Sequence, residues 1–164
     1  MSENTRSRTI EWDDPTIGAG RALTMSGLDY LRAMIAREIP GPPIAALMNM
    51  DLIAASSGEV TFSCEPNESH YNPIGAVHGG FACTVLDSVA GCAVHSTLSA
   101  TQAYTTLELK VSYLKPITSA TGEVRAEART VSVGRRAAFA EATLTDATGR
   151  VLATASSTLL VFER

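Results

Sequence analysis

The sequence has few of the features that would link it to nucleic acid, to a membrane or to secretion. Its 164 residues carry a net charge of −4, whereas a nucleic-acid-binding domain usually shows a basic stripe. No apolar run reaches the roughly 20 residues of a transmembrane helix. The opening stretch MSENTRSRTIEWDD contains no apolar signal core. We therefore expect a cytoplasmic protein without a nucleic-acid or membrane partner.

Cysteine is also scarce, with three residues in the chain: Cys64, Cys83 and Cys92. The number is odd and no CxxC pair occurs, so we expect reduced thiols in place of disulfides. The three histidines share no ligand spacing, and no metal is expected. Hydrophobic residues make up 45% of the chain and charged residues 18%, which indicates one globular domain with a sizeable core.

The N-terminal region predicts one helix. Residues 1–24 resemble a mostly polar arm, whereas SGLDYLRAMIARE has an N-cap serine, Ser26, and an aspartate, Asp29, at the capping-box position. The prolines of PGPP, residues 40–43, should end this helix. We assign residues 1–47 to an N-terminal arm and helix, and residues 48–164 to the main domain.

Most of the main domain shows strand patterns. Residues 48–64 predict a strand pair with a turn at Ser57-Gly58. After residue 103, four alternating stretches predict four consecutive strands joined by short turns, and therefore an antiparallel sheet. In the first of them, YTTLELKVSYLKP, the alternation places Leu107, Leu109, Val111 and Tyr113 on one face and Thr106 on the other.

Between these strand regions, residues 78–97 predict a helix that is apolar almost all round, and such a helix is buried. Asp87 is the only formally charged side chain from Phe81 through Ala103. The outline is an α+β architecture in which one long sheet curls around one buried helix. Such a sheet could pair with a copy of itself.

The segment NPIGAVHGGFACTVLD carries the candidate chemistry. A helix that begins at His78-Gly79-Gly80 presents unpaired N–H groups, a ready site for an oxyanion. Asp87 follows a little over two turns later, and Asn72 precedes the helix. This set suits hydrolysis of an ester or thioester. On spacing alone, a structural Asp87 bonded to a neighbouring strand is an equal alternative, and His78 alone would be an ordinary N-cap.

The same segment, together with YTTLELKVSYLKP and GRRAAFAEATLTDATGRVLATASSTLLVF, resembles the hotdog-fold thioesterases. The pattern Asn…Gly-x-x-His-Gly-Gly…Asp is similar to the phenylacetyl-CoA thioesterase (PaaI-like) branch of the 4-hydroxybenzoyl-CoA thioesterase superfamily. The resemblance covers residues 48–162. It implies a hotdog fold, a curved antiparallel sheet around a central helix, with an extra N-terminal helix in this chain.

The resemblance also implies roles for individual residues. Asp87 matches the helix carboxylate that acts as general base or nucleophile. Gly79 matches the glycine whose N–H polarises the thioester carbonyl, and Asn72 matches the loop residue that holds the attacking water or the substrate. His78 matches the histidine that supports the loop and the thioester end.

A serine or threonine from the partner subunit often completes such a site. Counting back from SYLKP places it at Thr106, with Thr105 as the near alternative. Gly80 is expected to contact substrate, and Arg135 and Arg136 fall where basic residues often contact coenzyme A phosphates. A solvated turn is an equal interpretation of the arginine pair.

The resemblance therefore implies an acyl-CoA thioesterase that needs no cofactor beyond the coenzyme A of its substrate. Its site would lie between two subunits, with a homodimer as the minimal unit and a homotetramer as a common assembly. The alternative is a non-catalytic module that senses acyl-CoA. A hydratase fits poorly because Asp87 follows His78 by nine residues.

Overall fold

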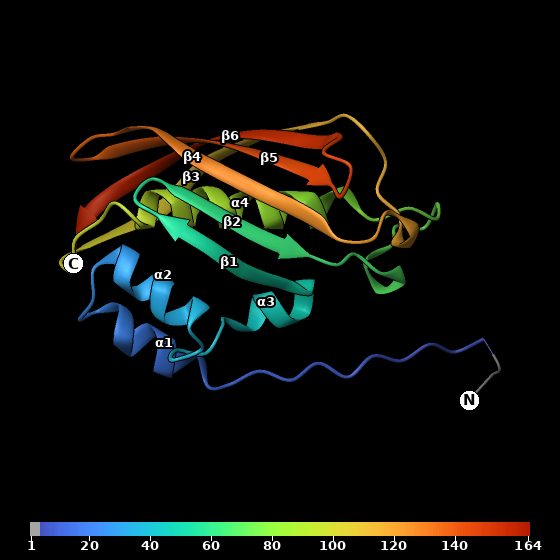
Figure 1. Ribbon diagram of the computed structural model, residues 1–164, viewed down its shortest axis with the longest axis horizontal. Helices are drawn as coiled ribbons and strands as arrows, with labels where there is room; N and C mark the ends of the chain where they lie inside the picture. Colours follow the sequence, from blue (N-terminus) through green and yellow to red (C-terminus); the bar gives the residue numbers. More distant parts are fainter. Residues whose placement is uncertain (1–3) are drawn as a thin grey trace.

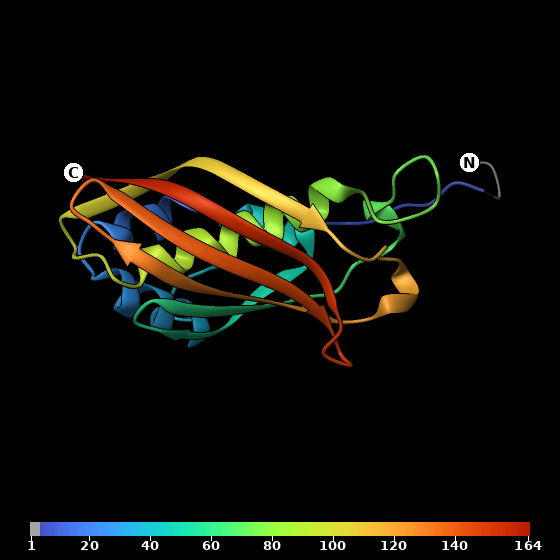
Figure 2. The same ribbon diagram turned by 90° about the horizontal axis from the view of Figure 1, so that it is seen from above.

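The computed structural model describes residues 4–164 and contains one antiparallel sheet wrapped around one long helix. The sheet strands are β1 (Met50–Ser56), β2 (Glu59–Cys64), β3 (Gln102–Tyr113), β4 (Val124–Val133), β5 (Ala137–Asp146) and β6 (Val151–Glu163). Their spatial order is β1-β2-β4-β5-β6-β3. The central helix is α4 (Gly79–His95), and the strands cross it obliquely (Figures 1 and 2). This is the predicted α+β hotdog fold.

The apolar composition of α4 explains its position. Val85, Leu86 and Val89 are fully buried on the helix, and they pack in one core with strand residues such as Leu144 and Leu159. Each such aliphatic side chain contributes about 1.5–3 kcal/mol when it leaves water. The predicted helix over 78–97 and the strand pair with its turn at Gly58 are both confirmed.

The connection after β3 differs from the prediction. The segment is not a short turn: residues 114–123 pass the N-terminus of α4, where Val77 N–H donates to the Ile117 carbonyl at 2.9 Å. The segment includes a 3-10 turn, η2 (Ser119–Thr121). As a result β3 pairs with β6 and not with β4, and it forms one edge of the sheet.

A β-bulge in β3 changes which residues face the helix. Thr106 pairs with Leu159 and Glu108 pairs with Thr158, so Leu107 is an extra residue without a partner. Leu159 is buried, and Thr106 beside it therefore also faces α4. Leu107 is 62% exposed. The predicted face was wrong for Thr106 and Leu107, because strict alternation cannot anticipate a bulge, and right for Leu109 and Val111, which pack on the core.

The N-terminal region contains three helices where the sequence predicted one. The predicted helix is α2 (Gly27–Ile35), and Ser26 caps it by accepting from Asp29 N–H at 3.2 Å. The polar-arm prediction was wrong for α1 (Pro15–Ala22), which starts with proline at its first position after an aspartate cap. Likewise α3 (Pro43–Met48) starts where the prolines were expected only to stop a helix.

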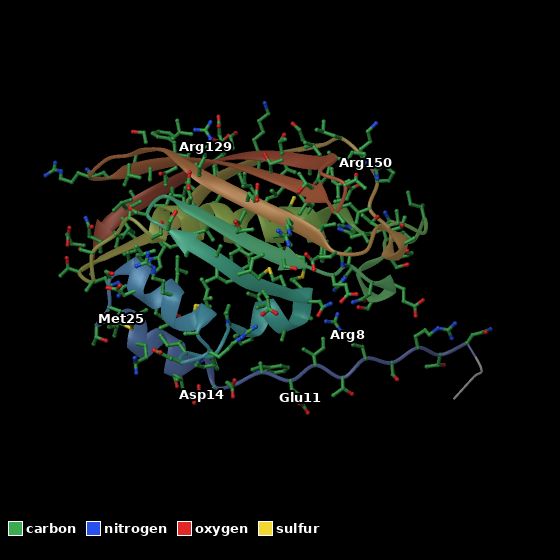
Figure 3. The ribbon with its side chains drawn as sticks, in the orientation of Figure 1. Arg8, Glu11, Asp14, Met25, Arg129 and Arg150 are labelled. Atoms are coloured by element: carbon green, nitrogen blue, oxygen red, sulfur yellow. The ribbon has the colours of Figure 1, made fainter. Side chains whose placement is uncertain are left out.

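These three helices lie on the side of α4 away from β5 and β6 (Figure 1). The chain before them runs extended beneath α3. Arg129 and Arg150, by contrast, point away from the helices on the outer side of the sheet (Figure 3). The division of the chain at residues 47 and 48 stays a prediction; β1 begins at Met50.

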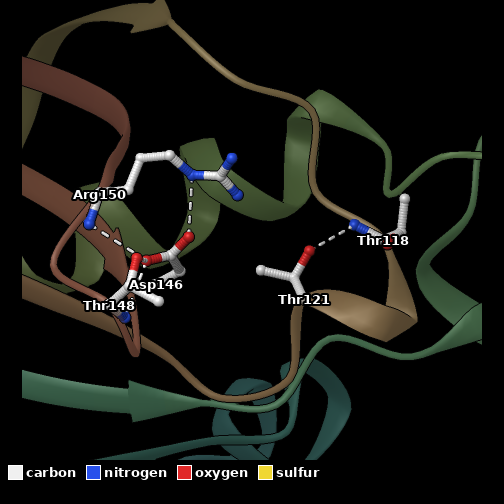
Figure 4. Close-up of polar contacts among 5 residues, drawn as sticks. All are labelled: Thr118, Thr121, Asp146, Thr148 and Arg150. Carbon is white, nitrogen blue, oxygen red and sulfur yellow. Dashed lines mark hydrogen bonds and ion pairs between the residues drawn. The ribbon is translucent and has the colours of Figure 1, made fainter.

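The β5–β6 hairpin forms at the predicted DATG turn. Asp146 Oδ1 accepts from Thr148 N–H and from Arg150 N–H, at 3.0 and 3.1 Å, and its Oδ2 accepts from Arg150 Nε at 2.9 Å (Figure 4). The Thr148 hydroxyl also donates to Asp146 Oδ1, at 2.6 Å, and this bond, together with the other donors, holds the pKa of Asp146 below its usual value. Gly149 supplies the positive φ of 82° that the turn needs.

Among residues 4–164, no helix is long and apolar enough to cross a membrane.

Candidate active site

The N-terminus of α4 has one occupied and one open N–H donor. His78 is the N-cap, and its Nδ1 accepts from Gly80 N–H at 2.8 Å. Because Nδ1 accepts, the imidazole proton is on Nε2, which can donate outward. Gly79 N–H has no hydrogen-bond acceptor within residues 4–164. A side chain at Gly79 would lie 3.2 Å from the Tyr113 ring, so glycine fits this crowded position.

Asn72 is fixed beside this helix end by a tight loop. Its Oδ1 accepts from Ile74 N–H at 3.0 Å and from Ala76 N–H at 3.1 Å. With Oδ1 occupied, the Nδ2 group is left as a donor in a set direction, without a partner among the described residues. Asn72, His78 and Gly79 line one cavity of about 350 Å³. The structure therefore brings these three predicted residues together.

Asp87 lies on a different part of α4 and pairs with β3. Its Oδ1 accepts from Thr106 Oγ1 at 2.9 Å, and both side chains are half-buried. Its Oδ2 has no partner among the described residues. Thr105 pairs with Leu160 and is exposed, on the opposite face of the strand. Of the two candidate threonines, the one beside the carboxylate is Thr106, and it belongs to the same chain.

The charge of Asp87 affects neighbouring groups on the same side of α4. Burial, with the carboxylate adding to it, raises the pKa of the Cys92 thiol to about 12. Burial and the same charge also raise the pKa of Tyr104. Burial raises the pKa of Cys64 to about 12 as well. These two thiols stay protonated at neutral pH, which makes them poor nucleophiles.

Within one chain the two sets of groups are too far apart to act on one carbonyl. Gly79 and Asp87 are eight residues apart on a helix, which corresponds to about 12 Å along its axis. Nothing bends α4 between them, since it is one continuous helix. The chain thus presents a donor end, with Asn72, His78 and Gly79, and a separate carboxylate pair, Asp87 with Thr106.

Arg135 and Arg136 lie in the β4–β5 turn, far from the donor end. Ala137 follows them and pairs with Leu160, which pairs in turn with Thr105 at the start of β3. The donor end is instead near the last residue of β3, Tyr113. Both arginines are exposed, and neither forms an ion pair with another described residue.

Sequence reasoning missed two groups that support the donor end. The first is Tyr113, expected only as an apolar strand residue: its hydroxyl donates to the Gly79 carbonyl at 3.2 Å and contacts Cys83 Sγ at 2.8 Å. No sequence pattern marked Tyr113, because it lies near Gly79 only once β3 is placed beside the start of α4. Its contact with Cys83 and partial burial raise the pKa of Tyr113 to about 12.

The second is Arg8, from the segment expected to be a polar arm (Figure 3). Its guanidinium donates to the Ala46 carbonyl at 2.9 Å and contacts His70 Nε2 at 3.1 Å. The His70 carbonyl accepts from His78 N–H at 2.8 Å. The N-terminal segment is therefore connected to the cap of α4 through one loop histidine.

His95 is in the last turn of α4, a position where a positive charge would suit the C-terminal end of the helix. The ring is instead buried against Tyr30 and Tyr104. Burial, and secondarily the charge of Arg164, lowers the pKa of His95 to about 4. Its Nδ1 has no hydrogen-bond partner within residues 4–164. In the described part of the chain, no group of three His, Cys, Asp or Glu side chains could hold a metal ion.

Comparison with known proteins gives consistent matches. The family described as thioesterase superfamily matches residues 74–153. A Halobacterium salinarum protein named as a candidate esterase is 33% identical over 124 residues, covering 71% of this chain and 80% of that protein. Human acyl-coenzyme A thioesterase 13 is 28% identical over 109 residues, covering 65% of this chain and 76% of the human protein.

Among solved structures, a Ralstonia eutropha protein superposes with a TM-score of 0.73 at 28% identity, covering 80% of this chain and 98% of that chain. That protein is described as a thioesterase-type protein related to phenylacetic acid degradation. The matched family segment contains His78, Gly79, Asp87 and Thr106. The chain belongs to the thioesterase superfamily.

Proposed function

We propose that this protein hydrolyses acyl-CoA thioesters to free coenzyme A and a carboxylic acid. The observation that carries the proposal is the open Gly79 N–H at the start of α4, found together with Asp87, which lies further along the same helix and accepts a hydrogen bond from Thr106 of β3. The name of the human relative, an acyl-coenzyme A thioesterase, supports the substrate class. The description of the Ralstonia protein supports the finer assignment to the phenylacetyl-CoA thioesterase branch.

We further propose that each site combines two subunits. A carbonyl held by Gly79 of one subunit would lie about 12 Å from Asp87 of that same subunit, so the carboxylate must come from a second copy. The edge strand β3 carries Thr106 and has unpaired backbone groups that a second β3 could pair with. Pairing of two β3 strands about a two-fold axis would make the two α4 helices antiparallel. It would bring Asp87 of one subunit towards the donor end of the other.

In this arrangement the thioester oxygen accepts from Gly79 N–H, which stabilises the charge that develops on it. Asn72 Nδ2 and His78 Nε2 can donate to water or to the thioester end. Asp87 Oδ2 takes a proton from water as the water attacks the carbonyl carbon. Collapse of the tetrahedral intermediate breaks the C–S bond, and Asp87 gives the proton that it took from water to the departing thiolate of coenzyme A, which restores the carboxylate.

The same geometry permits a nucleophilic route. In it Asp87 attacks the carbonyl carbon, expels the thiolate and forms a mixed anhydride, which water then cleaves to the acid and the free carboxylate. Thr106 holds Asp87 Oδ1 in both routes, and this leaves Oδ2 as the reacting oxygen. The exposed Arg135 and Arg136 would contact the phosphates of coenzyme A. A dimer is the minimal active unit, and dimers would pair into tetramers.

The test is release of free thiol from a panel of aryl and aliphatic acyl-CoA substrates. Asp87→Asn should lower turnover by at least about a hundredfold, with the melting temperature and oligomeric state unchanged. Glu127→Gln, on an exposed carboxylate of β4, is the matched control and should retain full turnover. Full activity in Asp87→Asn would overturn the assignment. Tight acyl-CoA binding without hydrolysis by the wild type would favour the sensing module instead.

A further inference from the structure

A second cavity lies under the N-terminal helices, where the sheet does not cover α4. It has a volume of about 190 Å³, is open on one side, and is lined by residues of α2, α3, β1, β2, β3 and the second half of α4. Most of its wall is apolar or aromatic and comes from these residues: Met34, Ile44, Leu52, Phe62, Cys92 and Tyr104. The ion pair between Arg37 and Asp51, at 3.0 Å, lies at its rim.

This cavity is next to the carboxylate of the proposed site. Ser88, the residue after Asp87 on α4, lines it. Cys92 and Tyr104 line it too, and the pKa of each is raised in part by the charge of Asp87. The Ser88 hydroxyl is turned back onto the helix, where it donates to the Thr84 carbonyl at 2.7 Å. The cavity therefore begins within one helical turn of Asp87 and offers few polar partners.

Its size selects among possible occupants. A cavity of about 150 Å³ with an aliphatic and aromatic lining is known to bind benzene, and this one is slightly larger. It is smaller than the 300 Å³ or more that a whole drug-sized ligand fills, so it cannot take the nucleotide of coenzyme A. A phenyl ring or an aliphatic chain of about six carbons matches both its volume and its lining.

We propose that this cavity receives the acyl group of the substrate, and that Met34 of α2 and Ile44 of α3 limit the size of that group. The proposal rests on the proposed thioesterase function and adds a substrate class: acyl groups of about phenyl size. It also gives the N-terminal helices a role, because they supply two walls of the cavity. With the thioester bound at Asp87, the acyl chain would lie in this cavity beside α4, and coenzyme A would lie outside it.

The experiment measures kcat/KM of the full-length protein for acetyl-, hexanoyl-, phenylacetyl- and decanoyl-CoA. Ile44→Trp fills the cavity from a side chain that is 40% exposed, so the fold should tolerate it. It should lower the phenylacetyl-to-acetyl ratio by about tenfold. Met34→Ala enlarges the cavity and should raise the decanoyl-to-hexanoyl ratio by about tenfold. Leu47→Trp is the control, because Leu47 is exposed on α3 but does not line the cavity.

Ratios within one preparation cancel any loss of folded protein, so a destabilised variant still gives an answer. Shifts in both ratios, with Leu47→Trp within about twofold of wild type, would support the proposal. An active enzyme whose ratios do not change in Ile44→Trp and Met34→Ala would overturn it while leaving the thioesterase function in place. No hydrolysis of any substrate by the wild type would instead reject the function on which the proposal rests.

Discussion

A complementation experiment tests whether the site combines two subunits. Asp87→Asn removes the carboxylate and keeps the donor end, whereas Asn72→Ala removes an amide donor and keeps the carboxylate. Each variant alone should be nearly inactive, because every site in either homodimer lacks one component. When the two variants are mixed within one dimer, one of the two sites receives an intact Asp87 from one chain and an intact Asn72 from the other.

The expected magnitude follows from the separation of the two groups on α4. With about 12 Å between Gly79 and Asp87, no site can form within a single chain. Random pairing of equal amounts makes half of the dimers mixed, and each mixed dimer has one working site of two. The mixture should therefore show about a quarter of the wild-type activity per total protein, whatever the size of the acyl group.

The assay is thiol release after co-expression of the two variants with different affinity tags. Tandem purification isolates the mixed dimers, for which about half of the wild-type activity is expected. The control is a mixture of separately purified homodimers measured before any exchange of chains. If the isolated mixed dimers are no more active than the average of the two homodimers, the separation argument is refuted and each chain must complete its own site.

Three further predictions concern single residues. Thr106→Val should lower kcat by about tenfold, because it removes the hydrogen bond that the half-buried Asp87 carboxylate accepts. Thr106→Ser should restore most of the lost kcat. Gly27→Ala should lower the free energy of unfolding by about 3 kcal/mol in urea, since the new Cβ would clash with the His95 carbonyl; Gly20→Ala, with open space around it, is the control. Burial keeps His95 neutral when folded, with its pKa near 4, so the unfolded chain alone takes up a proton below about pH 6.5. Stability should therefore fall by about 2 kcal/mol more from pH 7 to pH 5 in wild type than in His95→Phe, and equal pH slopes in urea melts would contradict this.

The helix α4 and the cap of α2 could be predicted from the sequence, because the residues that determine them are close together in the chain. The helix at α4 follows from an apolar run without proline or charge, and the Ser26 cap follows from side-chain chemistry within one turn. The donor end could be predicted for the same reason. Asn72 and His78 bond to backbone groups no more than four residues away, so their short spacing already contains the geometry.

Features that depend on distant segments could not be predicted in this way. The bulge at Leu107 is visible only once β3 is paired with β6, and it decides that Thr106 and not Thr105 faces Asp87. Alternation carries no signal for one extra residue. The Tyr113 contact with Gly79 likewise joins residues 34 positions apart.

The N-terminal helices show the same limit and also its functional consequence. A helix can be predicted from its own sequence, but the surface that it covers cannot. The fold alone shows that α2 and α3 line a cavity near Asp87. Ile44 lies on α3, and the prolines at the start of α3 were predicted to end a helix. No pattern in that segment therefore pointed to Ile44. The sheet and α4 alone leave one face of the helix open, and the chain must cover that face with something. The covering segment lies outside residues 74–153, the segment that matches the family, and outside the donor end and the Asp87–Thr106 pair. We therefore expect substitutions in it to change the size of the acyl group that is accepted and to leave the proposed catalytic groups in place.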